Sequence, residues 1–167
     1  WSSVSFVRPA HKLIALLADN TLDVAVLGLK SGRETLGHRF EAAVTPVVIK
    51  DADSYAATLL KDGAVLANFE ERRAEIVRQL QAAALQAGKL DSTTYQPIED
   101  EALLDEVTAL VERPNVLTCA FEKEFLEVPQ ECLILTMKAN QKYFPLLDAN
   151  GKLSNQFLVV SNISPVD

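Results

Sequence analysis

The chain has 167 residues, of which 49% are apolar and 23% are charged, and these proportions are typical of a globular protein. Its formal net charge of −7 argues against a protein that coats nucleic acid non-specifically, because such binding depends on Lys and Arg side chains that neutralise phosphates. No apolar run approaches the roughly 20 residues that a membrane-spanning helix needs, so we expect no membrane association and a cytoplasmic location. The length suits a single domain over residues 1–167, and the start at Trp1 indicates that this domain comes from a longer chain.

Charged side chains are spread unevenly along the sequence. Residues 1–40 carry five basic and three acidic side chains, residues 41–137 carry eight and eighteen, and residues 138–167 carry three and two. The acidic excess is therefore central, and the two ends are mildly basic. Cys119 and Cys132 are the only cysteines, and their spacing fits no zinc site. We expect two buried, reduced thiols, with no disulfide and no bound metal.

The N-terminal part of the sequence predicts strands and an exposed connection. Apolar runs over residues 13–17 and 22–27, separated by an Asp-Asn turn, predict an antiparallel pair. Residues 29–40 contain glycines, a serine and several basic side chains, which predict an irregular and exposed connection. The glycine spacing does not fit a phosphate-binding loop. For His38 the sequence fixes no titratable partner, so ordering of the loop or contact with a partner is favoured over acid–base catalysis.

Two helices are predicted in the middle of the sequence. The first begins in the cluster of Asp and Ser residues over 51–54 and ends at Gly63. Residues 64–67 are apolar and predict a short strand. The second and longest helix is predicted from Asn68 to Gly88, with an apolar stripe on one face and charged side chains on the other.

A third helix and a further strand are predicted next. Residues 88–98 are polar and predict a loop, and three acidic residues over 99–101 begin a helix that ends before Pro114. Residues 115–121 predict a strand. Helices and strands are interspersed without regular βαβ order, which indicates an α+β fold with a mixed, mostly antiparallel sheet and packed helices.

The stretch from Glu131 to Ile163 predicts a short helix followed by a hairpin. Apolar residues recur at helical spacing up to Gln141. The dipeptide Asn150-Gly151 favours a tight turn, so we expect residues 143–147 to pair antiparallel with residues 157–161. The junction between helix and hairpin gathers two cations, an amide and a phenol.

Six motifs along the chain resemble those of one protein family. Residues 137–163, MKANQKYFPLLDANGKLSNQFLVVSNI, resemble the MK-x-x-QKYFP segment, with its following GKL and NI, in the beta subunit of bacterial glycyl-tRNA synthetase. The other five are FVRP-x-H at 6–11, GHRF at 37–40, F-x-x-R-R at 69–73, LL-x-EV-x-x-LVE at 103–112 and FL-x-VP-x-E at 125–131. Arg113 departs from the pattern, because the family has a tryptophan at that place.

The resemblance implies a role in charging tRNA. In that family the alpha subunit activates glycine with ATP, the beta subunit contributes to tRNA recognition, and the two form an alpha-beta heterotetramer. It therefore implies tRNA(Gly) and the alpha subunit as partners, and no catalytic residue and no cofactor in this region.

Two alternatives stay open. The region is similar in fold to the editing-type domains of the phenylalanyl-tRNA synthetase beta subunit, so it could hydrolyse mischarged tRNA, or it could be a pure inter-subunit scaffold. Editing is the weaker alternative, since a site for glycine, the smallest amino acid, can exclude larger ones sterically.

The two segments that match the family best are also the basic ends of an acidic chain, and we therefore expect them to form one exposed patch that contacts the tRNA backbone. The candidate residues are Arg33, His38, Arg39, Lys138, Gln141, Lys142 and Tyr143. The last four also fit another interpretation, in which Lys138, Gln141 and Lys142 form a solvated helix face and Tyr143 belongs to the core.

Overall fold

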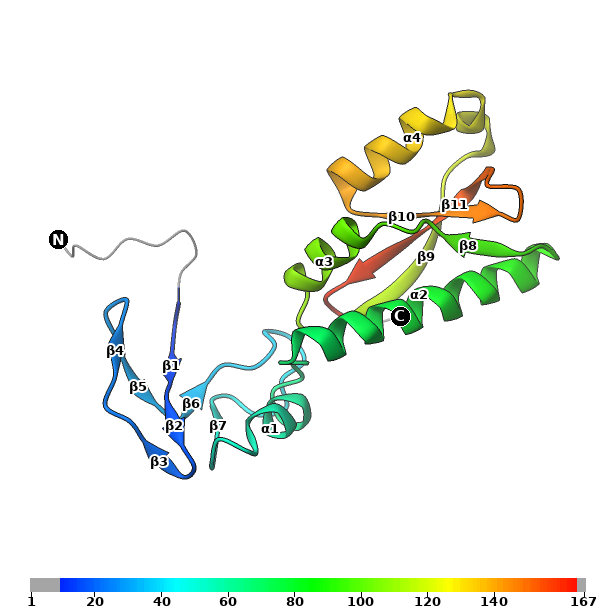
Figure 1. The fold of residues 1–167 in the computed structure, drawn as a ribbon. Coiled ribbons are helices and arrows are strands. Elements are labelled where there is room, and N and C mark those ends of the chain that lie inside the picture. The colour runs from blue at the N-terminus through cyan, green and yellow to red at the C-terminus, as the bar shows by residue number, and fades with distance from the viewer. Residues whose placement is uncertain (1–9, 165–167) are drawn as a thin grey trace. The chain divides into compact units, whose positions relative to one another are not determined.

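The computed structural model describes residues 10–164 and divides the chain into two compact units (Figure 1). The first unit ends at Asn68 and the second begins at Phe69. Each has a buried apolar cluster of its own. The single domain expected over residues 1–167 stays a prediction. The motif residues Phe6, Val7, Arg8 and Pro9 lie outside the described residues.

Over residues 10–68, the first unit is built from short strands and one helix. Its elements are β1 (Leu13–Ile14), β2 (Leu16–Leu17), β3 (Asn20–Thr21), β4 (Ala25–Val26), β5 (Leu29–Gly32), β6 (Glu34–Thr35), β7 (Val47–Val48) and α1 (Tyr55–Lys61). Strand β5 lies between β1, to which it is parallel, and β4, to which it is antiparallel. The pairs β2–β3 and β6–β7 are antiparallel.

The expected antiparallel pair of residues 13–17 with residues 22–27 is correct only at its turn. Leu17 pairs with Asn20 across that turn, but the second apolar run folds back on residues 29–32 instead. The reversal occurs at Leu27 and Gly28, whose φ angles of 54° and 78° fit a tight two-residue hairpin turn.

Two further predictions for the first unit are wrong. Residues 29–40 are not wholly irregular, since they contain β5 and β6. The polar side chain of Ser31 is accommodated in β5 because its hydroxyl accepts a hydrogen bond from Val24 N at 3.0 Å and donates one to Leu22 O. Residues 64–67 form no strand, because Val65 N donates instead to Leu59 O at the end of α1.

The core of the first unit is small. Val47, Ile49 and Leu59 are the buried residues of its apolar cluster, and four partly buried side chains pack against them: Ile14, Leu16, Val65 and Ala67. Many large apolar side chains of this unit are instead exposed, including Leu17, Val26, Phe40 and Val48.

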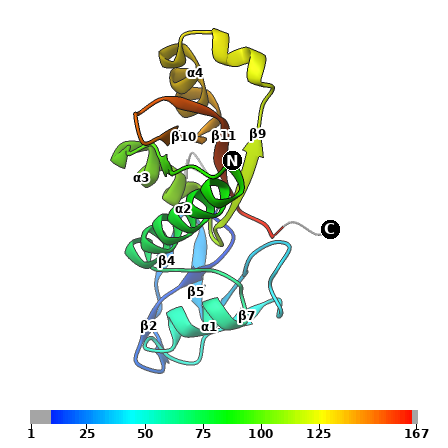
Figure 2. The ribbon, with the colours of Figure 1, turned by 90° about the vertical axis from the view of Figure 1, so that its right-hand side faces the viewer.

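The second unit is a four-stranded antiparallel sheet with helices. Its elements are α2 (Phe69–Asp91), β8 (Tyr95–Pro97), α3 (Glu101–Leu110), β9 (Asn115–Ala120), the 3-10 helix η1 (Lys123–Glu127), α4 (Gln130–Thr136), the π-helical turn η2 (Met137–Gln141), β10 (Phe144–Asp148) and β11 (Leu153–Ser161). The strand order is β8-β10-β11-β9. Figure 2 labels three of these strands, β10, β11 and β9. The α+β class with a mostly antiparallel sheet is confirmed.

Helices α2 and α3 cover one face of this sheet. Their apolar stripes meet three buried strand residues, Phe144, Leu146 and Leu158, in a single cluster. The predicted antiparallel hairpin is confirmed, with Phe144 opposite Leu158, but its second strand begins earlier than predicted, because Leu147 lies opposite Leu153. The predicted third helix is also confirmed, with Asp100 as its N-cap residue.

The loop predicted over residues 88–98 is wrong in two respects. Helix α2 continues past Gly88 to Asp91, and residues 95–97 form β8 at the edge of the sheet. Gly88 does not end the helix but allows close packing, since a Cβ there would lie 2.6 Å from Thr93 O.

The two cysteines are less buried than predicted. Cys119 is partly buried and Cys132 is exposed, because α4 has no buried residue. Within residues 10–164, no helix is both long enough and apolar enough to cross a membrane.

Candidate nucleic-acid interface

In the first unit, the candidate residues His38 and Arg39 belong to a turn that is hydrogen-bonded to the residues at the end of α1. His38 N donates to Gly63 O at 2.6 Å, and Ala43 N donates to Asp62 O at 2.9 Å. Gly37 makes this approach possible, because a Cβ at that position would lie 2.5 Å from Gly63 Cα. The turn over residues 37–43 therefore has a defined position on its own unit.

The His38 side chain is buried, with 2% exposure, whereas the sequence predicted an exposed residue. Its Nδ1 atom accepts from Phe40 N at 3.2 Å and from Glu41 N at 3.1 Å. The imidazole therefore carries no proton on Nδ1 in this arrangement. The buried ring stabilises the turn through these two hydrogen bonds, and ordering of this loop is one of the roles expected from the sequence.

Arg39 and Phe40 lie on the outside of the same turn. Both are exposed, and the exposure of Phe40 reaches 70%. The Arg39 guanidinium carbon lies 5.4 Å from the centre of the Phe40 ring, which is within the range of a cation–π contact. The turn thus presents a cation and an aromatic ring to solvent side by side.

Arg33 differs from Arg39 in that its guanidinium is used inside the first unit. It donates to Lys50 O at 3.0 Å, to Asp19 O at 2.8 Å and to Thr21 Oγ1 at 3.2 Å. These bonds join β3 and its turn to the segment after β7. An arginine with so many backbone partners has an evident structural role.

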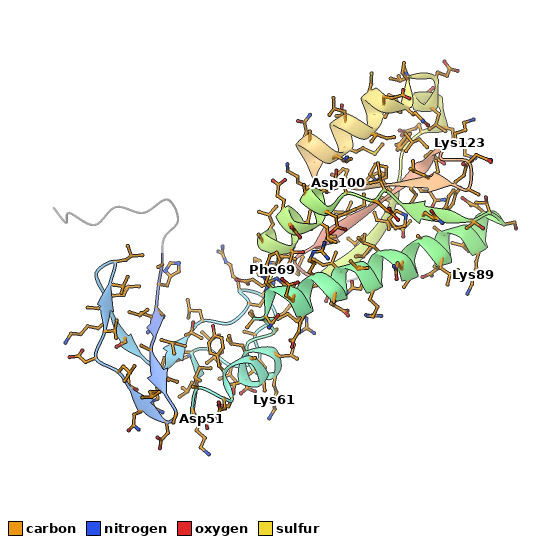
Figure 3. The ribbon with its side chains drawn as sticks, in the orientation of Figure 1. Asp51, Lys61, Phe69, Lys89, Asp100 and Lys123 are labelled. Atoms are coloured by element: carbon orange, nitrogen blue, oxygen red, sulfur yellow. The ribbon has the colours of Figure 1, made fainter. Side chains whose placement is uncertain are left out.

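In the second unit, Lys138 forms an ion pair with Asp100, which Figure 3 labels at the start of α3. Asp100 also caps that helix, because its Oδ1 accepts from Leu103 N at 2.9 Å. The hydrogen bond from Lys138, followed by the backbone bond, lowers the pKa of the Asp100 carboxyl below its ordinary value of 3.8. Lys138 is thus tied to the N-terminus of α3.

Lys142 is held in a similar way. Its φ angle of 58° ends the π-helical turn, its Nζ donates to Ala139 O at 2.9 Å, and the same atom lies 3.0 Å from a Glu106 carboxylate oxygen. Both lysines therefore connect the turn before β10 to α3.

Gln141 and Tyr143 have different surroundings. Gln141 is exposed. Tyr143 is partly buried, and its ring stacks on Phe157 with the ring centres 4.8 Å apart. Among the described residues, Tyr143 is not one of those that form or pack against the buried cluster of this unit, so the alternative interpretation, in which it belongs to the core, stays a prediction. Each group of candidates lies within its own unit, and the single patch that would join them stays a prediction.

Sequence reasoning missed three residues at these places. Phe40 was part of the GHRF motif but was not a candidate, because sequence does not reveal whether an aromatic ring is exposed. Asp100 was expected only at the start of a helix and Glu106 only as part of a family motif, because sequence does not reveal which lysines pair with them.

The whole chain, residues 1–167, matches the family model described as glycyl-tRNA synthetase beta subunit. It is 71% identical over its full length to the glycine--tRNA ligase beta subunit of Dechloromonas aromatica and covers 24% of that protein. It is likewise 71% identical to the protein of the same name from Polaromonas naphthalenivorans, of which it covers 23%. The chain thus spans about a quarter of the length of these curated relatives. It belongs to the glycyl-tRNA synthetase beta subunit family.

Proposed function

We propose that this chain is a non-catalytic, tRNA-contacting and architectural part of a glycine--tRNA ligase, supporting the glycylation of tRNA(Gly). The observation that carries the proposal is the family match over all 167 residues, together with relatives whose names specify a tRNA ligase. A glycyl-tRNA synthetase alpha subunit is its proposed protein partner, and the cytoplasm its proposed location. ATP and glycine are proposed to bind to that alpha subunit.

The distribution of charge supports a tRNA contact on the first unit. Residues 1–68 carry seven basic and seven acidic side chains, whereas residues 69–167 carry nine and sixteen. The whole net charge of −7 therefore belongs to the second unit. RNA phosphates are repelled less by the neutral unit than by the acidic one.

Among the seven candidates, Arg39 is the most available cation. It is exposed, and within residues 10–164 it forms no ion pair. Lys138 and Lys142 stay candidates for phosphate contact, but each would have to share its ammonium group with Asp100 or Glu106. Gln141 could donate its amide to a phosphate or ribose oxygen without losing an ion pair.

The test uses the complete enzyme, with the substitutions made in the full-length beta subunit. Arg39→Ala, and separately Lys138→Ala with Lys142→Ala, are expected to weaken tRNA(Gly) binding in a filter assay. Each lost phosphate contact should lower the slope of log affinity against log salt by about 0.7 to 0.9. Glycine-dependent pyrophosphate exchange should stay at the wild-type rate, because the chemistry is proposed to occur elsewhere.

A matched control is Lys89→Ala, which removes an exposed lysine of α2 that extends away from the sheet (Figure 3). It should leave both the affinity and the salt slope unchanged. Wild-type affinity and slope in the Arg39 variant and in the double lysine variant would refute the tRNA-contacting role.

A scaffold is the second candidate function, and a specific observation favours it. The first unit exposes Leu17 by 67%, Val26 by 50% and Val48 by 53%, although its buried core is small. Such side chains are suited to contact with another protein surface. If this is their main role, Leu17→Ser and Val48→Ser should impair assembly with the alpha subunit in sedimentation experiments while the tRNA affinity of the enzyme that still assembles stays unchanged.

A further inference from the structure

Phe40 has the largest exposed fraction of any aromatic residue in the described part of the chain, at 70%. Single exposed apolar side chains are common on protein surfaces, so exposure alone carries little weight. Phe40 is unusual because its exposed ring lies on a hydrogen-bonded turn and next to a guanidinium group. These two properties bear on what the ring can bind.

The backbone of the turn is fixed before any ligand arrives. The buried His38 ring accepts the amide hydrogens of both Phe40 and Glu41, and the turn is bonded to Gly63. A side chain on such a turn loses less backbone freedom on binding than one on a mobile loop. His38 is thus a positioning residue for Phe40.

Arg39 adds a planar cation beside the ring, with its guanidinium carbon 5.4 Å from the ring centre. Aromatic rings and arginine planes are the two kinds of surface on which proteins stack unpaired bases. The guanidinium can also bind a phosphate through two donors. The pair therefore matches both the base and the backbone of a single nucleotide.

We propose that Phe40 is a stacking site for an unpaired nucleobase of tRNA and that Arg39 binds the adjacent phosphate or the base plane. This inference rests on the proposed function, and it adds a specific contact and a class of nucleotide to it.

An apolar protein surface is the alternative to a nucleobase as the binding partner of Phe40. Leu36 and Val44 flank the turn and are exposed by 46% and 49%, which would suit such a partner. An apolar protein interface would, however, remove water from the Arg39 guanidinium without providing an anion, and this is costly. RNA provides both an apolar base and an anion, so the combination of residues favours RNA.

The experiment replaces Phe40 in the full-length beta subunit of the assembled enzyme by three residues. Phe40→Ala removes the ring, Phe40→Leu keeps apolar volume without a flat face, and Phe40→Trp keeps the flat face. We expect the first two to weaken tRNA(Gly) binding by about 5 to 150-fold, as for the loss of one stacked base, and the third to bind like the wild type. The salt slope should stay unchanged in all three, whereas Arg39→Ala should lower it.

The matched control is Phe125→Leu, at a phenylalanine of the second unit that is 48% exposed. It should not alter tRNA affinity. An unchanged sedimentation coefficient of the enzyme will establish that every variant assembles with the alpha subunit. As a direct readout, p-benzoylphenylalanine in place of Phe40 should cross-link to an unpaired nucleotide of tRNA(Gly).

The outcomes separate this inference from the function on which it rests. Wild-type affinity in Phe40→Leu with a loss in Phe40→Ala, or cross-linking to protein alone, would identify a protein contact and overturn the inference. Wild-type affinity in all three Phe40 variants would overturn it as well. If Arg39→Ala or the double lysine variant still weakened binding in that case, the proposed tRNA contact would stand without stacking.

Discussion

Replacing Asp100 should separate two contributions that this one carboxylate makes to the stability of the second unit. Its Oδ1 atom caps α3 through Leu103 N, and its other oxygen pairs with Lys138. Loss of an N-cap costs about 1 kcal/mol. The ion pair is partly screened, since the two side chains are 29% and 21% exposed, and we assign it about 0.5 to 1 kcal/mol.

Three substitutions distinguish these effects. Asp100→Ala loses both contributions and should lower the free energy of unfolding by about 1.5 to 2 kcal/mol. Asp100→Asn keeps a capping oxygen and loses only the pair, so it should cost about 0.5 to 1 kcal/mol, and Lys138→Met should cost a similar amount. Combining these last two should cost no more than either alone, because both remove the same interaction.

Urea unfolding followed by far-ultraviolet circular dichroism is the appropriate assay. Helices α2 and α3 contain 23 and 10 residues, whereas the described part of the first unit has one helix of 7, so the signal reports mainly on the second unit. Glu99→Gln, which neutralises the exposed residue before the cap, is the control and should change stability by less than about 0.5 kcal/mol. Equal losses in Asp100→Ala and Asp100→Asn would refute the capping argument. An unchanged Lys138→Met variant would refute the ion pair and leave that lysine available for RNA.

The remaining predictions concern packing, pH and activity. Leu146→Ala should cost about 2 to 5 kcal/mol in urea unfolding because the side chain is fully buried, whereas Leu90→Ala, at 80% exposure, should cost less than about 0.5 kcal/mol; similar losses would contradict the assigned core. Gly37→Ala should speed amide hydrogen exchange at Phe40 and Glu41, because its Cβ would lie 2.5 Å from Gly63 Cα, and wild-type protection would argue against a fixed turn. The lowered pKa of Asp100 means that its pairing with Lys138 stabilises the fold above pH 3.8 and that this contribution is lost as pH falls through the lower, folded-state value. The stability difference between wild type and Lys138→Met should therefore vanish in acid, and a difference that persists there would exclude this carboxylate as the cause. The chain by itself should show no glycine-dependent pyrophosphate exchange, and exchange above background would contradict a non-catalytic role.

Much of the second unit follows from local sequence signals. The helices α2 and α3 were predicted from caps and apolar spacing, and the β10–β11 hairpin from Asn150-Gly151 between two apolar runs. These signals act over a few residues and need no knowledge of distant segments. The same reasoning mistook Gly88 for a helix end, because the carbonyl of Thr93 that requires a glycine there approaches only in the folded chain.

The sequence by itself determined the family, the α+β class and the segments in which the candidate residues lie. Only the tertiary structure decided the use of each side chain, since that depends on neighbours brought together by folding. In the folded chain, Lys138 and Lys142 form ion pairs with carboxylates at α3. His38 is buried within its own turn, whereas Arg39 and Phe40 are exposed to solvent. Charge and residue type show what a side chain can bind, but burial and pairing are non-local and determine whether it is available to do so.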